Sequence, residues 1–194
     1  MKRVRVCSMP GVLLVRQTGA SLVELIIVVT IVAVLLGLGV PAFQEWMVNT
    51  RIRTASDSML NGLQVARAEA IKRNRYVDFR LDADAAGGWR VVSAPNNAMC
   101  PVVDDPVADD VLQRRSAQEG AQGLAATTDN PNALRVTFTP MGMVTVACGA
   151  PFAILEVTSD VIAAPRLLRV VVGPTGGMRM CEPSRPANDP RACP

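Results

Sequence analysis

The residues of this chain that could do chemistry are mainly cysteines, carboxylates and arginines, because none of its 194 residues is a histidine. Without an imidazole there is no Ser-His-Asp or Cys-His pair and no histidine-ligated metal. The sequence also contains neither a G-x-S-x-G motif nor a phosphate-binding glycine loop. We therefore predict that the chain is not an enzyme. The alternative is an anchored enzyme that uses an acid pair such as Asp82 and Asp84.

The C-terminal segment concentrates positive charge. From residue 166 onward it has five arginines against Glu182 and Asp189, an excess of three positive charges. Arginines on a constrained loop can bind phosphates through two hydrogen bonds each. This segment has no aromatic side chain on which bases could stack.

Four of the five cysteines lie in the second half of the chain, at Cys100, Cys148, Cys181 and Cys193. An even number of cysteines in an oxidising compartment predicts two disulfides. Cys181 and Cys193 are 12 residues apart, and we expect them to close a loop that holds the tail against the last strand. A disulfide of that size contributes about 3 kcal/mol in the chain-entropy model. The pairing of Cys100 with Cys148 follows by elimination.

The loop after Cys100 is a candidate calcium-binding loop because it carries two pairs of aspartates, one on each side of a proline. Their spacing lacks the D-x-D-x-D-G register of a known calcium loop. We favour a solvated acidic loop, and we predict no metal and no cofactor. The aspartates are Asp104, Asp105, Asp109 and Asp110.

The first element that must position these groups is an apolar helix. Residues 25–40 contain no charge, and extension back to Ala20 gives 21 residues with Glu24 as the only ionisable side chain. At about 1.5 Å per residue this helix spans about 30 Å, one hydrocarbon core. The run is longer than the apolar part of a secretory signal, and no small-x-small cleavage site follows it. We predict a retained single-pass anchor over residues 20–40.

The charges before the anchor predict its orientation. Residues 1–19 contain four basic side chains and no acidic one. By the positive-inside rule this segment stays in the cytoplasm and the chain after the anchor lies outside.

Glu24 lies one helical turn inside the apolar span, where an unpaired carboxylate costs roughly 2.5 to 3.5 kcal/mol. One interpretation is that its side chain reaches the membrane interface at the N-terminal end of the helix, where the helix dipole favours negative charge. The other is that a cation pairs with it.

The residues around Glu24 carry a family resemblance. The run GASLVELI at residues 19–26, followed by the apolar helix, resembles the prepilin-type N-terminal signal of type IV pilins and type II secretion pseudopilins. The resemblance implies cleavage by a prepilin peptidase between Gly19 and Ala20, with N-methylation of Ala20. Glu24 and Pro41 would then be assembly residues. Glu24 would pair with the α-ammonium of a neighbouring subunit and so set the register of assembly, and Pro41 would loosen the helix.

This sequence departs from the family pattern in two places. Ala20 stands where the family usually has phenylalanine, and the 19-residue leader contains an apolar patch at residues 12–15. Translation from Met9 would shorten the leader to 11 residues. Neither departure changes the spacing between Gly19 and Glu24.

After the anchor, apolar and small side chains recur at alternating steps of four and three. This spacing predicts a helix with one buried stripe and a stop at Asn74. The stripe consists of Ile52, Ser56, Met59, Leu63, Ala66 and Ala70.

The rest of the chain predicts strands that are separated by Gly and Pro. We expect them at residues 76–81, 89–93, 134–139, 144–148, 152–158 and 167–172, and we expect residues 116–131 to form a mobile surface loop. The predicted fold class is α+β, a long N-terminal helix packed on antiparallel sheet, with a disulfide-tied C-terminal tail.

Residues 66–74, ARAEAIKRN, resemble the stretch that marks minor pseudopilins of the GspH/FimT type. The resemblance implies a structural subunit at or near the tip of a type IV pilus or a type II secretion pseudopilus. The implied partners are the prepilin peptidase, other minor pilins or pseudopilins and the assembly platform of the bacterial inner membrane. The implied segments are a leader (1–19), a filament-core helix (20–40), an amphipathic continuation (41–75) and a periplasmic β-rich domain (76–194).

Members of this family that act in natural transformation bind DNA through a C-terminal Gly-Arg-x-Arg-x-Cys-like motif. The corresponding residues here are GGMRMC, at 176–181. Arg179 matches the second arginine, whereas Gly177 stands in place of the first, for which Arg185 and Arg191 could substitute. The resemblance thus makes Arg179, Arg185 and Arg191 the candidate DNA-contacting residues. We therefore favour an assembly role, and we keep DNA as a further partner in the second hypothesis.

Overall fold

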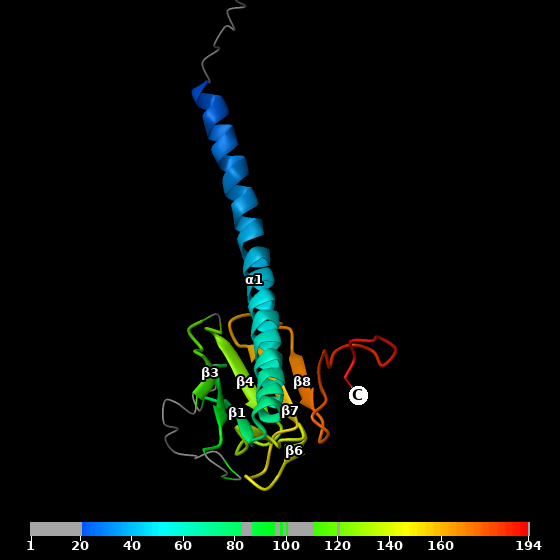
Figure 1. The fold of residues 1–194 in the computed structure, drawn as a ribbon. Helices are drawn as coiled ribbons and strands as arrows, with labels where there is room; N and C mark the ends of the chain where they lie inside the picture. The colour runs from blue at the N-terminus through cyan, green and yellow to red at the C-terminus, as the bar shows by residue number, and fades with distance from the viewer. Residues whose placement is uncertain are drawn as a thin grey trace, which may run out of the picture. The chain divides into compact units, whose positions relative to one another are not determined.

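The computed structural model describes residues 21–82, 87–95, 98, 100, 111–119 and 121–193, without the side chains of Leu38 and Pro41. Its only helix in these ranges, α1, runs from Leu22 to Arg73 (Figure 1). The chain divides into two compact units, Met1–Pro41 and Ala42–Pro194.

In the first unit, α1 exposes nearly every apolar side chain that it carries. Leu22, Ile26 and Leu36 have more than half of their surface exposed, at 76%, 53% and 60%. Of the described residues, only α1 is long and apolar enough to cross a membrane. The predicted anchor therefore corresponds to a helix whose apolar surface has no partner among the described residues of this unit.

In the second unit, α1 buries one face. All six residues of the predicted stripe, Ile52 to Ala70, are at most 1% exposed, which confirms the stripe. The helix ends at Arg73, and Asn74 follows with a φ of 51°. Asparagine tolerates this left-handed conformation better than most residues and commonly ends helices. The predicted stop at Asn74 is therefore confirmed.

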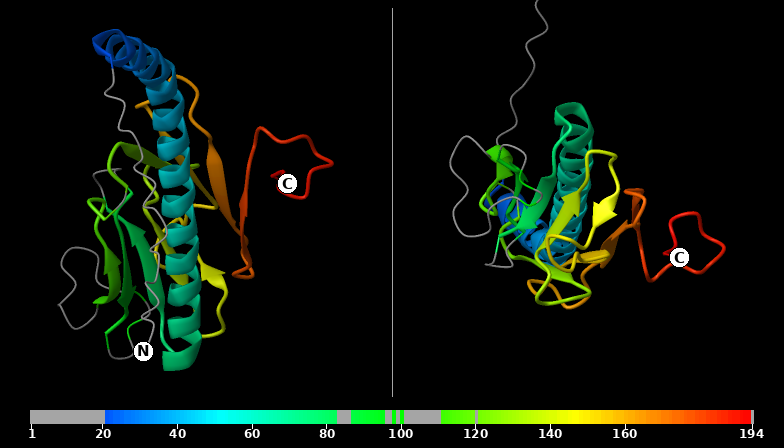
Figure 2. Two further views of the ribbon diagram at one scale, coloured as in Figure 1. Left: turned by 90° about the horizontal axis from the view of Figure 1, so that it is seen from above. Right: turned by 60° about the horizontal axis from the view of Figure 1, so that its bottom comes forward.

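The strands form two antiparallel sheets (Figures 1 and 2). The first has the order β3-β2-β1-β5-β6, with β1 Val77–Leu81, β2 Trp89–Ser93, β3 Val111–Arg115, β5 Arg135–Phe138 and β6 Val144–Thr145. The second has the order β4-β7-β8-β9, with β4 Leu124–Thr128, β7 Ile154–Ser159, β8 Leu168–Val172 and β9 Met178–Cys181. The α+β fold class with a long N-terminal helix on antiparallel sheet is thus confirmed.

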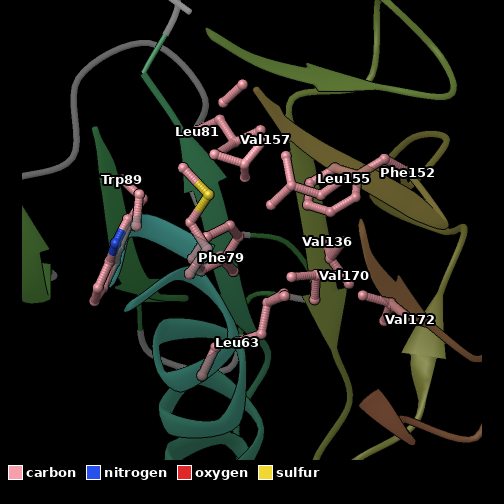
Figure 3. Close-up of a cluster of buried hydrophobic side chains, with 14 of the residues drawn as sticks. Leu63, Phe79, Leu81, Trp89, Val136, Phe152, Leu155, Val157, Val170 and Val172 are labelled. Carbon is pink, nitrogen blue, oxygen red and sulfur yellow. The ribbon is translucent and has the colours of Figure 1, made fainter. Parts of the chain in front are cut away.

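The core joins α1 to both sheets. Figure 3 shows Leu63 of α1 in one cluster with Phe79 of the first sheet and Val170 of the second. The indole N–H of Trp89 donates a 3.0 Å hydrogen bond to the hydroxyl of Ser58 on α1. A Cβ at Gly62 would lie 2.8 Å from the Phe79 ring, so this glycine lets the helix approach the sheet closely.

The predicted surface loop at residues 116–131 was wrong. It contains β4, which pairs along its whole length with β7. The sequence of β4, LAATT, is rich in alanine, which has little preference for strands. Because β4 is an edge strand, pairing with one neighbour suffices to fix it. The strand expected at 144–148 is also shorter, since β6 comprises only Val144 and Thr145.

Candidate functional site

Several residues singled out from the sequence cannot be placed. Gly19, Ala20, Asp84 and the four aspartates of the acidic loop lie outside the described residues. Glu24 lies in the first turn of α1 and is exposed. Pro41 lies within α1, which continues beyond it without interruption. The processing and assembly roles of these residues stay predictions.

The structure contains two disulfides. Cys181 is bonded to Cys193, with 5.0 Å between their Cα atoms, and Cys100 is bonded to Cys148, with 5.4 Å. The first closes the segment that follows β9. The backbone N–H of Glu182 also donates a 2.8 Å hydrogen bond to the carbonyl of Arg191. This C-terminal loop, residues 181–193, extends away from the sheet in Figure 2, and its two ends are tied together.

Glu182 is the centre of the charges in the C-terminal loop. Its side chain is only 10% exposed and accepts hydrogen bonds from two guanidinium groups. Nη2 of Arg166 and Nε of Arg185 each lie 3.0 Å from Glu182 Oε2. The carboxylate thus joins the β7–β8 connection, which contains Arg166, to the C-terminal loop.

The remaining arginines of this segment also have partners within the chain. Arg191 pairs with Asp189 at 3.3 Å, and Arg169 of β8 pairs with Glu156 of the neighbouring β7. Nη2 of Arg179 donates a 3.0 Å hydrogen bond to the carbonyl of Ala192.

These pairings weaken the case for a DNA interface. Four of the five arginines contact a carboxylate. Glu156 adds a third negative charge to those of Glu182 and Asp189, which reduces the local excess to two positive charges. A DNA phosphate would have to compete with Glu182 and Asp189 for the same donors. Arg185 and Arg191 lie on the C-terminal loop, where carboxylates hold both of them in place, whereas Arg179 lies on β9 and contacts Ala192 of the loop.

Acid should weaken this network. The guanidinium groups of Arg166 and Arg185, despite partial burial, hold the pKa of Glu182 below its usual 4.5. Because the folded-state pKa is the lower one, the stabilisation is complete above about pH 4.5 and is lost as the pH falls through the folded-state value. We expect Glu182→Gln to cost about 1 kcal/mol at pH 7, a modest value because the partner arginines are 35% and 40% exposed.

Melting temperatures of the wild type and Glu182→Gln between pH 7 and pH 3 test this expectation. The difference between the two proteins should shrink as the pH falls, and a constant difference would contradict it. Asp78, a buried carboxyl group whose pKa is also shifted, is present in both proteins, so its effect cancels in the comparison.

Arg67, within the ARAEAIKRN stretch, makes a contact that the sequence did not reveal. Its Nε donates a 3.0 Å hydrogen bond to the carbonyl of Gly142, in the turn between β5 and β6. Gly176, in the turn between β8 and β9, packs against the same carbonyl. The helix and both sheets therefore meet at Gly142, and the two glycines were the only signal of this junction in the sequence.

A second buried polar cluster lies on the first sheet. Asp78 of β1 is fully buried and accepts hydrogen bonds from Arg80 Nε at 3.0 Å and Nη2 at 2.9 Å. Nη1 of Arg135 on β5 lies 3.7 Å from the same carboxylate oxygen. Burial raises the pKa of Asp78, and the hydrogen bond with Thr137 and the charges of the two arginines oppose that shift.

Comparison with known proteins gives a consistent result. The sequence model of a protein family described as type II transport protein GspH matches residues 55–176. The type IV minor pilin FimU of Pseudomonas aeruginosa PAO1 is similar in structure, with a TM-score of 0.50 and 17% identity over 70% of this chain and 92% of FimU. The minor pseudopilin EpsH of the Vibrio cholerae type 2 secretion system gives a TM-score of 0.47 and 16% identity over 70% and 99%. No curated protein sequence matches.

Proposed function

Since the chain belongs to the GspH family of pilin-like structural proteins, we propose that it is a tip or priming subunit of a type IV pilus or a type II secretion pseudopilus. One observation carries the proposal. Residues 22–40 of α1 present an apolar surface with no partner in the described part of their own unit, while the same helix continues into a packed domain. Lipid would cover that surface before assembly, and the apolar helices of other pilins or pseudopilins would cover it in the filament.

The proposed processing follows the N-terminal signal. A prepilin peptidase removes residues 1–19 and Ala20 becomes the methylated N-terminus. Residues 20–40 then hold the subunit in the inner membrane, with residues 41–75 and the β-rich domain 76–194 in the periplasm. Glu24, in the first turn of α1, pairs with the α-ammonium of a neighbouring subunit during assembly at the membrane platform.

Mass spectrometry of the protein from cells with an active prepilin peptidase tests this proposal. We expect a mature chain that begins at N-methylated Ala20, whereas Gly19→Val should keep the intact chain because the cleavage site is lost. Glu24→Gln is the matched variant: it should be cleaved normally and should be depleted at least tenfold from isolated filaments, because the buried ion pair cannot form. An intact 194-residue mass for the wild type would contradict the proposal.

DNA binding is the second candidate function, and one observation favours it. Arg179 contacts a carbonyl, and no carboxylate of the described residues forms an ion pair with it. On β9 it contacts Ala192 of the loop that carries Arg185 and Arg191 and that the Cys181–Cys193 disulfide closes. These three arginines would be the phosphate-contacting residues.

A gel-shift titration of the full chain in a non-ionic detergent, at low and moderate salt, distinguishes the two functions. If assembly is the function, we expect no salt-sensitive shift. A shift that weakens steeply with salt and disappears when Arg179, Arg185 and Arg191 are changed to alanine would favour DNA uptake. Alanine at Arg51, Lys72 and Arg73, three exposed basic residues of α1, is the matched control for net charge.

A further inference from the structure

Four arginines form a row across the first sheet, on the face opposite the core. In the strand register Arg80 of β1 lies directly opposite Arg90 of β2 and Arg135 of β5, and Arg90 lies opposite Arg114 of β3. Neighbouring strands are about 4.8 Å apart, and like charges in directly opposite positions destabilise a sheet. Such an arrangement needs compensating negative charge.

The described residues supply only part of that charge. Asp78 pairs with Arg80 and Arg135, and Asp82 lies 3.9 Å from Arg90. Among the described residues, two carboxylates thus face four guanidinium groups.

Arg90 and Arg135 also have unused hydrogen-bond donors. Within the described ranges, neither guanidinium donates a hydrogen bond, and Nε of Arg90 and Nη1 of Arg135 are buried atoms without an acceptor. A guanidinium has five N–H donors, and a buried donor without an acceptor costs about 1 to 3 kcal/mol. Both side chains are therefore held in place without the hydrogen bonds that they could make.

These donors border a pocket of about 440 Å³. Arg80, Arg90 and Arg135 line it together with the amides of Asn130 and Asn132. This volume lies within the range of small-ligand sites, about 300 to 1,000 Å³. The lining thus combines positive charge with side-chain amides that can also donate hydrogen bonds.

Gly149 lines the pocket at a position where a larger residue would collide with Arg135. A Cβ there would lie 2.8 Å from Nη2 of Arg135, and the φ of Gly149 is +114°. The preceding residue, Cys148, is fixed by its disulfide with Cys100. The loop therefore approaches the Arg135 guanidinium closely and is covalently tied in that position.

We propose that this pocket is a binding site for an oxyanion, a carboxylate or phosphate group, which Arg90 and Arg135 hold through charge-assisted hydrogen bonds. The bound group adds negative charge beside Arg90 and Arg135. It must be small or carried on a flexible side chain, because the side chains of Arg80, Arg135 and Arg90 are only 7%, 22% and 35% exposed. The phosphate backbone of a DNA duplex is too bulky to reach them. The site is separate from the C-terminal loop and goes beyond the proposed subunit role.

Calorimetric titration of the full chain in a non-ionic detergent, at constant ionic strength, tests the proposal. One arm uses inorganic phosphate as a free anion, and the other uses a short glutamate-containing peptide as a carboxylate carried on a protein. We expect saturable binding in at least one arm, weakened at least tenfold by Arg90→Gln and by Arg135→Gln. Arg51→Gln, at an exposed position of α1 outside the pocket, should leave binding unchanged.

The outcomes are distinguishable. Binding of phosphate identifies a free anion as sufficient, and binding of the peptide alone identifies a carboxylate of another protein as the ligand. Absence of binding in both arms, or equal weakening by Arg51→Gln, overturns the proposal. If Arg135→Gln fails to fold, Arg90→Gln still decides the question, because it leaves both arginine contacts of Asp78 intact.

Discussion

Gly176→Ala is expected to lower the free energy of unfolding by roughly 3 kcal/mol. Gly176 has a φ of +79°, a conformation that side chains with a Cβ rarely adopt, and its added Cβ would lie only 2.0 Å from the carbonyl oxygen of Gly142. The backbone strain and the steric overlap act together. Because the obstructing atom belongs to the backbone, a rotamer change cannot relieve the overlap.

The position of the Gly142 carbonyl is fixed from several sides. It accepts the hydrogen bond of Arg67 from α1, and the N–H of Gly142 donates a 2.8 Å hydrogen bond to the Thr139 carbonyl. The N–H of Val144 donates a 3.0 Å hydrogen bond to the carbonyl of Pro174 in the opposing turn. Movement of either turn would therefore break contacts between the two sheets.

Urea denaturation followed by the fluorescence of Trp89 measures this effect. Gly177→Ala is the matched control, because Gly177 has no positive φ and the nearest atom to its added Cβ is 3.9 Å away. We expect it to change stability by about 0.5 kcal/mol or less. Equal losses in the two variants would mean that the glycine contact is not what holds the turns together.

Asp78→Ala is expected to lower the free energy of unfolding by about 3 to 5 kcal/mol. The substitution leaves Arg80, whose side chain is 7% exposed, without the carboxylate that accepts two of its hydrogen bonds. It also removes the charge that faces Arg135. The arginine row would then keep its positive charges with Asp82 as the remaining carboxylate partner among the described residues.

The same denaturation experiment on Asp57→Ala provides the comparison. Asp57 pairs with Arg53 at 3.8 Å, but both side chains are more than half exposed, and such pairs contribute about 0 to 1 kcal/mol. A loss for Asp78→Ala no larger than that for Asp57→Ala would show that the buried cluster does not stabilise the sheet. Asp78→Asn keeps the size of the side chain and separates the loss of charge from the loss of packing.

Periodicity explains why so much of the fold was predictable. The stripe on α1 repeats over five turns of helix. Strands such as β1, β2 and β8 are short runs rich in valine, leucine and aromatic residues, and polar and apolar side chains alternate in β1. These signals are local. They do not depend on knowing what each element packs against.

The missed strands lack such signals. β3 reads VLQRR and is half exposed at an edge, β4 reads LAATT, and β9 has only four residues. Their positions are fixed by backbone pairing with a neighbour, which single-sequence patterns do not report. The division of the strands into two sheets was missed for the same reason.

The candidate sites also differ in whether local sequence signals or the pairing of distant residues determine them. The cysteines and the arginines of the tail could be found from residue type and spacing. The pairing of Glu182 with Arg166 joins residues 16 apart, and the row from Arg114 to Arg135 depends on the register of four strands. Register is a property of the assembled sheet, so the anion pocket could not be predicted from the chain alone.

The buried stripe of α1 also determines how the domain bears mechanical load. From Ile52 to Ala70 it extends about 27 Å along the helix axis. Tension along the axis of residues 42–73 of α1 would act parallel to this interface, so the contacts of the stripe would be loaded in shear and would have to slip together. A force perpendicular to the helix would peel them away one turn at a time. A subunit pulled through its helix is therefore held in its strongest direction.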